Sequence, residues 1–184
     1  PCVLGEMVKI GRRGSMNCSL AVKGKRGHAA YPHLADNPIT KLVKILHDLK
    51  SEPIDDGTEW FPPSNLEISS VDVANGAFNV IPAAAHARFN VRFNDSRPAD
   101  AIKGWIHDIC ARHAESFELE MTVTGEAFHT EPNRLTDILT DVCEKVTGNT
   151  PVLCTSGGTS DARFIKDMCP VVEFGTTGRT PHQV

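Results

Sequence analysis

A long alternation of apolar and polar side chains, from residue 80 to residue 93, constrains the fold of this chain more than any other feature. Alanine, phenylalanine and valine face one way from Ala83 to Phe93, whereas His86, Arg88 and Arg92 are among the residues that face the other way. A period of two predicts a β-strand with one buried face and one wet face.

The elements around this strand form a regular series. Alternation predicts further strands at 17–23, 65–73 and 117–124, and a period near 3.6 predicts two helices, one opening at Asp36-Asn37-Pro38 and one near Pro98. Asn75-Gly76, between the second and third strands, favours a tight hairpin. We expect Asp95 or Ser96 to cap the second helix. The apolar stripes of the two helices are expected to be Ile39, Leu42, Val43, Ile45, Leu46 and Leu49 in the first, and Ala101, Ile102, Trp105, Ile106, Ile109 and Cys110 in the second.

The order strand, helix, strand, strand, helix, strand is typical of the split βαβ (ferredoxin-like) unit. Right-handed crossovers would place both helices on one face of a four-stranded antiparallel sheet, which gives a two-layer α+β domain over residues 15–124.

The rest of the chain is expected to have a different order of helices and strands. A helix at 133–147 stops at Gly148, a short strand follows Pro151, and a glycine turn leads to a short helix and to a buried strand, Pro170 to Phe174. This alternation is typical of an α/β layer, but it is too short to form a stable layer by itself.

Composition excludes several classes of protein. The formal net charge of −4 and the isoelectric point near 6.1 argue against binding to nucleic acid or to an acidic membrane surface. No apolar run approaches the roughly 20 residues that span a bilayer. The six cysteines form no C-x-x-C pair, so we expect buried free thiols in a reducing cytoplasm and not a structural zinc site. Both ends of the chain read as interior positions of a longer protein.

Four segments carry side chains suited to chemistry, and each also has an ordinary structural interpretation. Arg12 and Arg13 lie between glycines and suit a carboxylate ligand, or form a solvated basic turn. His28 lies in a loop with Tyr31 and His33; its imidazole can donate to an oxyanion, or belongs to a surface pair of histidines. The segment 156–161 suits an anion, or is a capped turn. His182 is a metal ligand or merely exposed.

The residues of these segments and the order in which they occur resemble those of the succinyl-diaminopimelate desuccinylases, a family of dinuclear zinc aminoacyl hydrolases. The segments that carry the resemblance are Leu4 to Ser15, Gly27 to Pro38, Asn79 to Pro82, Arg92, Gly157 to Phe164, and Val171 to Gly175 running on to His182. Related deacetylases share the motifs of His28 and Asn79 but usually lack the glycine-threonine-serine-aspartate loop.

The resemblance implies a domain organisation. In this family a catalytic domain holds two zinc (or cobalt) ions, and an inserted split βαβ domain forms a homodimer. Residues 1–14 are then a remnant of the catalytic domain and its hinge, 15–124 are the dimerisation (lid) domain, and 125–184 are the end of the α/β zinc-peptidase catalytic domain.

The resemblance also implies roles for individual residues. His182 is expected to be the one metal ligand supplied late in the chain. His28 is expected to be catalytic, reaching into the partner's active site to steady the oxyanion, with Tyr31 and Asn79 near the partner's substrate. Contacts to the carboxylates of the substrate are expected from Arg12, Arg92, Gly158, Thr159 and Ser160.

The implied reaction is hydrolysis of N-succinyl-LL-diaminopimelate to succinate and LL-diaminopimelate, on the cytoplasmic route to lysine and cell wall. The remaining zinc ligands and the glutamate base are expected before Pro1, so the 184 residues alone should bind zinc incompletely and be inactive. Two alternatives stay open. The chain is only a dimerisation or binding module, or it belongs to a sibling hydrolase such as an acetylornithine deacetylase or a zinc carboxypeptidase.

Overall fold

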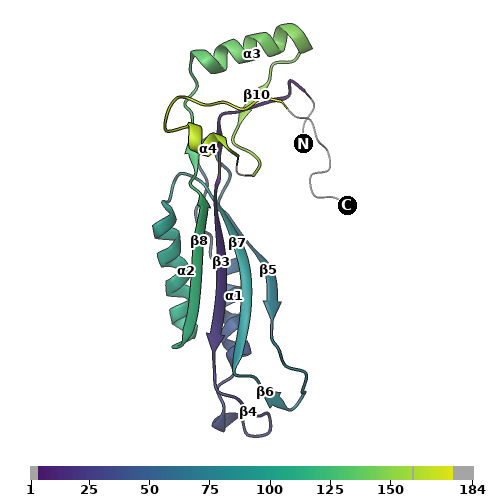
Figure 1. Ribbon diagram of the computed structural model, residues 1–184, viewed down its shortest axis with the longest axis vertical. Helices are drawn as coiled ribbons and strands as arrows, with labels where there is room; N and C mark the ends of the chain where they lie inside the picture. Colours follow the sequence, from purple (N-terminus) through teal and green to yellow (C-terminus); the bar gives the residue numbers. More distant parts are fainter. Residues whose placement is uncertain (1–3, 159, 176–184) are drawn as a thin grey trace.

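The computed structural model describes residues 4–158 and 160–175. Its largest part is a four-stranded sheet in the order β5-β7-β3-β8, and every pairing in it is antiparallel. Helices α1 and α2 pack against each other on one face of this sheet, and the other face is uncovered (Figure 1). In chain order, these elements are β3 (Gly14–Lys23), α1 (Pro38–Ser51), β5 (Asn65–Asp72), β7 (Ala84–Phe93), α2 (Ala99–His113) and β8 (Phe117–Gly125).

The core lies between this sheet and its helices. Inward positions of β3 and β7 are fully buried, among them Leu20, Val91 and Phe93, while the alternate positions face the uncovered side. From the helices, Ile45 and Ile106 are also fully buried. The alternation read from the sequence therefore reports burial correctly on these strands.

Several local expectations were wrong. Val43 and Ala101 were expected in the buried stripes, but both are exposed, because the packed strip of each helix is narrower than its apolar face. The cap of α2 is Pro98, not Asp95 or Ser96. The imperfect alternation near Ser69 is a register shift between β5 and β7.

No tight hairpin forms at Asn75-Gly76. Gly76 lacks the positive φ that a type I′ turn requires. The expected long strand is also interrupted after β6 (Val80–Ile81), which leaves the sheet to pair with β4 (Gly27–His28). The chain between β5 and β7 therefore forms an excursion that reaches the loop after β3. We call the part formed by β4, β6 and the short helix η1 (Pro32–Leu34) the tip.

The opposite end of the sheet leads into the remaining elements, which we call the end fragment. The two-stranded ribbon β2 (Gly11–Arg12) with β9 (Phe128–His129) connects the two parts. Beyond it, β1 (Met7–Lys9) pairs in parallel with β10 (Val152–Cys154), and a single antiparallel bridge joins Lys9 to Glu173. The end fragment also contains α3 (Arg134–Thr147) and the one-turn helix α4 (Ala162–Ile165).

Helix α3 ends at Gly148, as predicted, where a φ of 74° forms a left-handed cap. Its apolar stripe is not packed, however, since Ile138, Val142 and Val146 are 50%, 49% and 78% exposed. The expected buried strand Pro170 to Phe174 is reduced to the bridge at Glu173, and Phe174 is 43% exposed. Among the described residues, no helix is both long and apolar enough to span a membrane.

Candidate functional site

The structure brings the sequence-predicted site residues together in two separate groups. His28, Tyr31 and Asn79 meet at the tip, whereas Arg12, Gly158 and Ser160 lie in or beside the end fragment. The four-stranded sheet separates the two groups (Figure 1).

Backbone pairing holds the tip group in place. His28 pairs with Val80 across β4 and β6, and the backbone N–H of Ala29 donates to the carbonyl of Asn79 at 2.9 Å. The ring centroids of His28 and Tyr31 are 5.9 Å apart, and both side chains are exposed. The side chains of His28, Tyr31 and Asn79 are therefore all exposed at the tip.

The hydrogen bonding of His28 favours one role for its ring. The backbone N–H of Ala30 donates to Nδ1 of His28 at 3.0 Å, so Nδ1 acts as an acceptor. In a neutral imidazole the proton then belongs to Nε2, which becomes the donor of the exposed ring. This arrangement suits a hydrogen bond to an oxyanion outside this chain.

A hollow of about 240 Å³ lies beside the tip. Arg26, Asn75, Pro82 and His86 are among the residues that line it. The side-chain amide of Asn75 donates to the carbonyl of Val80 at 2.8 Å, which ties the excursion after β5 to β6. None of the sequence-predicted site residues lines this hollow.

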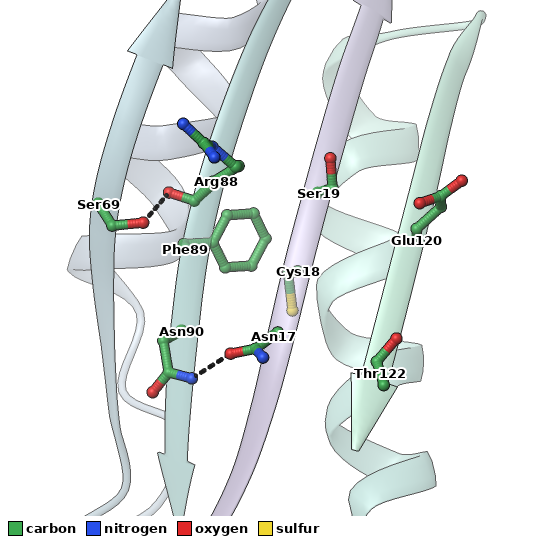
Figure 2. A pocket seen from close by; sticks show the side chains of 9 residues that line it. All are labelled: Asn17, Cys18, Ser19, Ser69, Arg88, Phe89, Asn90, Glu120 and Thr122. Carbon is green, nitrogen blue, oxygen red and sulfur yellow. Dashed lines mark hydrogen bonds between the residues drawn. The ribbon is translucent and has the colours of Figure 1, made fainter. Parts of the chain in front are cut away.

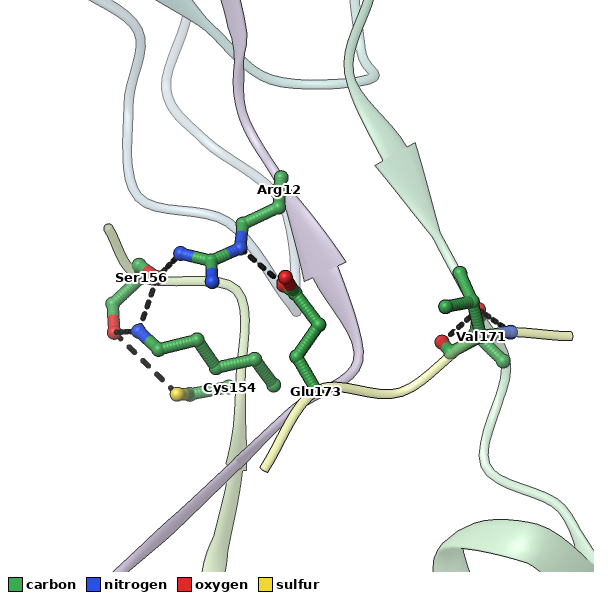
Figure 3. A network of polar contacts seen from close by, with 7 residues as sticks. Arg12, Cys154, Ser156, Val171 and Glu173 are labelled. Atoms are coloured by element: carbon green, nitrogen blue, oxygen red, sulfur yellow. Dashed lines mark hydrogen bonds and ion pairs between the residues drawn. The ribbon is translucent and has the colours of Figure 1, made fainter. Parts of the chain in front are cut away.

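The second group surrounds Arg12, whose side chain is only 15% exposed. Its Nε donates to Oε2 of Glu173 at 2.5 Å, and its Nη1 donates to the carbonyl of Ser156 at 3.3 Å. Lys9 donates from Nζ to the same carbonyl at 2.5 Å and to Oγ of Ser156 at 3.1 Å (Figure 3). Two cationic side chains therefore converge on the turn at Ser156.

The backbone conformation of the next residue favours glycine. Gly157 has a φ of 106°, and a Cβ at this position would lie 2.5 Å from Nη1 of Arg12. Gly158 continues the turn and is exposed. The hydroxyl of Ser160 is buried and has no hydrogen-bond partner within the described part of the chain. Thr159 and His182 lie outside the described residues.

Arg92 lies at the end of the sheet nearest to Arg12. It pairs with Ser15 of β3 and Asn65 of β5. Arg13 donates from Nη1 to Oδ1 of Asn65 at 2.8 Å. Burial, and then the nearby charge of Arg92, lower the pKa of Arg13 from its ordinary value. Arg13 and Arg92 therefore lie close together where the four-stranded sheet leads into the end fragment.

The uncovered face of the sheet carries a shallow polar pocket, which Figure 2 shows. Asn17, Arg88, Asn90 and Glu120 are among its lining residues, and Nδ2 of Asn90 donates to Oδ1 of Asn17 at 2.8 Å. No sequence-predicted site residue lies in this pocket. We therefore assign it no chemistry.

Metal ligands do not gather in the described ranges. No group of three or more His, Cys, Asp or Glu side chains there could hold an ion. Cys18 and Cys110 are buried and free, and burial raises the pKa of each thiol to about 12, which makes them poor ligands and poor nucleophiles.

Sequence reasoning assigned no role to two residues of the Arg12 group, Lys9 and Glu173. The signal for Glu173 was present, because a carboxylate inside the apolar run from Val171 to Phe174 needs a partner. The partner itself could not be read from the sequence, since it lies 161 positions away.

Comparison with known proteins shows the family to which the chain belongs. The sequence profile of the M20 peptidase dimerisation domain matches residues 10–118. Over 183 residues the chain is 49% identical to a succinyl-diaminopimelate desuccinylase of Gluconobacter oxydans, which covers 100% of this chain and 48% of the relative. Over 186 residues it is 53% identical to the enzyme of the same name from Caulobacter vibrioides, with 99% and 48% covered. The chain thus spans about half the length of these curated relatives.

Solved structures agree on the fold. A tripeptidase from Staphylococcus aureus superposes with a TM-score of 0.80 at 18% identity, over 98% of this chain and 48% of the tripeptidase. An M20 family metallo-carboxypeptidase from Sulfolobus solfataricus gives a TM-score of 0.66 at 14% identity, over 86% of this chain and 49% of the carboxypeptidase. With the profile matching more than half of its length, this chain belongs to the M20 peptidase dimerisation domain family.

Proposed function

We propose that this chain is part of a succinyl-diaminopimelate desuccinylase, which hydrolyses N-succinyl-LL-diaminopimelate to succinate and LL-diaminopimelate. Support comes from the identity of about half of all positions to enzymes of that name along the whole chain. This identity over the whole chain is the observation that carries the proposal. A cytoplasmic location goes with this assignment and rests on the resemblance alone.

We further propose that residues 15–124 form a split βαβ lid of the ferredoxin-like kind, inserted in a catalytic domain. The sheet order β5-β7-β3-β8, with both helices on one face, supports the first part. Residues 1–14 and 125–184 then belong to the catalytic domain. The exposed apolar stripe of α3 and the open two-stranded pair β1-β10 support this second part, because both features need a larger layer to cover them.

In this proposal each active site uses two protomers. Strands β3 and β7 have 10 residues each, so the sheet keeps the tip roughly 30 Å from the Arg12 group. One protomer therefore supplies the carboxylate-binding side chains, namely Arg12, Arg92 and the turn that contains Gly158, Thr159 and Ser160. The partner's tip supplies His28, which donates from Nε2 to the oxyanion, while Tyr31 and Asn79 orient the substrate.

The metal requirement belongs to the intact protein. Two zinc or cobalt ions are proposed there, with His182 as the ligand from this chain, and when bound they supply Lewis-acid activation of water. The described residues do not fit such a site by themselves, because they contain no cluster of donors. The 184 residues alone are therefore expected to show no desuccinylation.

Mixing two inactive variants tests the two-protomer site directly. In the intact desuccinylase that contains this chain, His28→Ala should abolish most turnover, since removing one oxyanion donor typically costs about 10²–10³ in kcat. Arg12→Ala should abolish most turnover at low substrate concentration, because it removes a contact to a substrate carboxylate. Unfolding and refolding the two variants together produces mixed dimers. In each mixed dimer one site has both His28 and Arg12, so about one quarter of wild-type activity should return.

The control is His33→Ala, which removes another exposed imidazole from the same loop and should leave turnover unchanged. If mixing restores nothing while both variants still dimerise, His28 and Arg12 act within one protomer and the two-protomer site is wrong. If the intact wild-type protein cleaves acetyl substrates in preference to succinyl ones, the family is right and the substrate is wrong.

A further inference from the structure

Arg12 and Glu173 form an ion pair that is shielded from solvent. Nε of Arg12 donates to Oε2 of Glu173 at 2.5 Å, and both side chains are largely shielded, at 15% and 28% exposed. Hydrogen bonds between two charged groups are stronger and more directional than neutral ones. Glu173 therefore fixes the plane of the Arg12 guanidinium.

Glu173 is itself held by its backbone. Its N–H donates to the carbonyl of Lys9 at 2.8 Å, and the N–H of Lys9 donates to its carbonyl at 2.9 Å. Nearby, Oγ1 of Thr130 donates to the carbonyl of Val171, which Figure 3 labels, at 2.8 Å. The backbone N–H of Thr130 donates in turn to the carbonyl of Ile10. The carboxylate is thus presented by a rigid segment and not by a loose loop.

Among the described residues, this contact leaves several donors of the guanidinium without a partner. Arginine has five N–H donors, of which Glu173 takes the one on Nε and the carbonyl of Ser156 takes one on Nη1. Lys9 holds the same carbonyl from its other side, at 2.5 Å. The remaining donors of Arg12 lie beside the turn that contains Gly157, where the buried hydroxyl of Ser160 also has no partner among the described residues.

We propose that Glu173 is a positioning residue for the bound carboxylate: it holds the Arg12 guanidinium beside the turn at Ser156 and Gly157, with its remaining donors directed to the ligand. This inference rests on the proposed function, because it assumes that Arg12 holds a carboxylate of the substrate. Without Glu173 the long Arg12 side chain samples other rotamers, and substrate binding weakens more than the chemical step does.

The test is a double-mutant cycle in the intact, metal-loaded desuccinylase. Glu173→Ala should raise KM for N-succinyl-LL-diaminopimelate about tenfold with kcat changed much less. Glu173→Gln keeps an acceptor oxygen but loses the charge, so it should raise KM by a smaller factor. In an Arg12→Ala background, Glu173→Ala should have no further effect. Asp167→Ala removes a surface carboxylate from the same fragment and serves as the control.

Each outcome has one meaning. Equal effects of Glu173→Ala with and without Arg12 would overturn the inference, since a merely structural role predicts additivity. A normal KM in Glu173→Gln would also overturn it, and this variant decides the matter if Glu173→Ala does not fold. If Arg12→Ala itself is harmless, the assignment of Arg12 fails. If the wild-type protein does not cleave the substrate, the proposed function fails.

Discussion

At the scale of single residues, Asp55 organises the loop between α1 and β5. Its Oδ1 accepts hydrogen bonds from the backbone N–H groups of Gly57 and Ser64, at 2.9 and 3.0 Å, and from Nδ2 of Asn94 at 2.6 Å. Burial by itself raises the pKa of Asp55, but the bonds from Ser64, Gly57 and Asn94 outweigh it, so the pKa lies below its ordinary value. The loop is therefore held by a charged acceptor.

This arrangement predicts a pH-dependent stability. A carboxylate whose folded-state pKa is depressed stabilises the fold at every pH above its unfolded value near 4, and this stabilisation is lost as the pH falls through the lower folded value. Asp55→Asn should therefore cost about 1–2 kcal/mol at neutral pH and progressively less in acid. Urea unfolding of the chain at neutral and acidic pH measures the difference. Asp56→Asn, at an exposed neighbour, should show no such trend.

Elements were predicted well where burial follows from local pattern. Strands β3, β7 and β8 alternate because one face of the sheet is packed. Helix α1 begins at the local cap Asn37, and α3 ends at the left-handed Gly148. Expectations failed where distant partners decide. Val43 is exposed although it lies on an apolar helical face, and β6 leaves the sheet because β4 offers it a partner.

The candidate site also has features that the sequence could predict and features that depend on distant partners. The motif residues were predicted from the resemblance, and their roles stay predictions. The grouping of His28 with Asn79, and of Arg12 with Ser156, depends on the tertiary fold, so neither local pattern nor spacing contained it. The contact between Arg12 and Glu173 was missed for the same reason.

Helix α3 provides a prediction at this scale. Its apolar stripe, which includes Ile138, is exposed in this chain. Under the proposed function, we expect the catalytic domain of the intact desuccinylase to cover it. Ile138→Glu should therefore change the stability of the isolated chain by less than about 0.5 kcal/mol. In the intact protein the same change should cost about 3 kcal/mol or more, because it buries an unpaired charge.

Urea unfolding of both forms makes the comparison. Asp141→Asn, at an exposed position on the same helix, should leave the free energy of unfolding nearly unchanged in both forms. An equal, small effect of Ile138→Glu in the isolated chain and the intact protein would show that nothing covers this face of α3.

At the scale of the whole molecule, the lid has two unpaired sheet edges, β5 and β8. At the β5 edge of the sheet, apolar side chains are exposed. Val71 of β5 is 54% exposed, and Val43 of α1, the helix that packs beside β5, is 60% exposed. An edge strand with apolar neighbours is a template for pairing with another chain. Because the lid belongs to a dimerisation domain family, we infer that a second copy covers this side.

Charging this side should therefore separate the protomers. Val43→Glu places a carboxylate in the inferred interface, where it loses its hydration, and it should weaken dimerisation of the intact protein by about tenfold or more. Ala101→Glu places the same charge on the exposed face of α2, near the other edge, and should leave the dimer intact. Sedimentation velocity across a dilution series measures both variants. Because His28 is proposed to act in the partner's site, activity per protomer should fall along the same dilution curve for Val43→Glu and stay constant for Ala101→Glu. Dissociation caused by Ala101→Glu instead would place the interface on the β8 side.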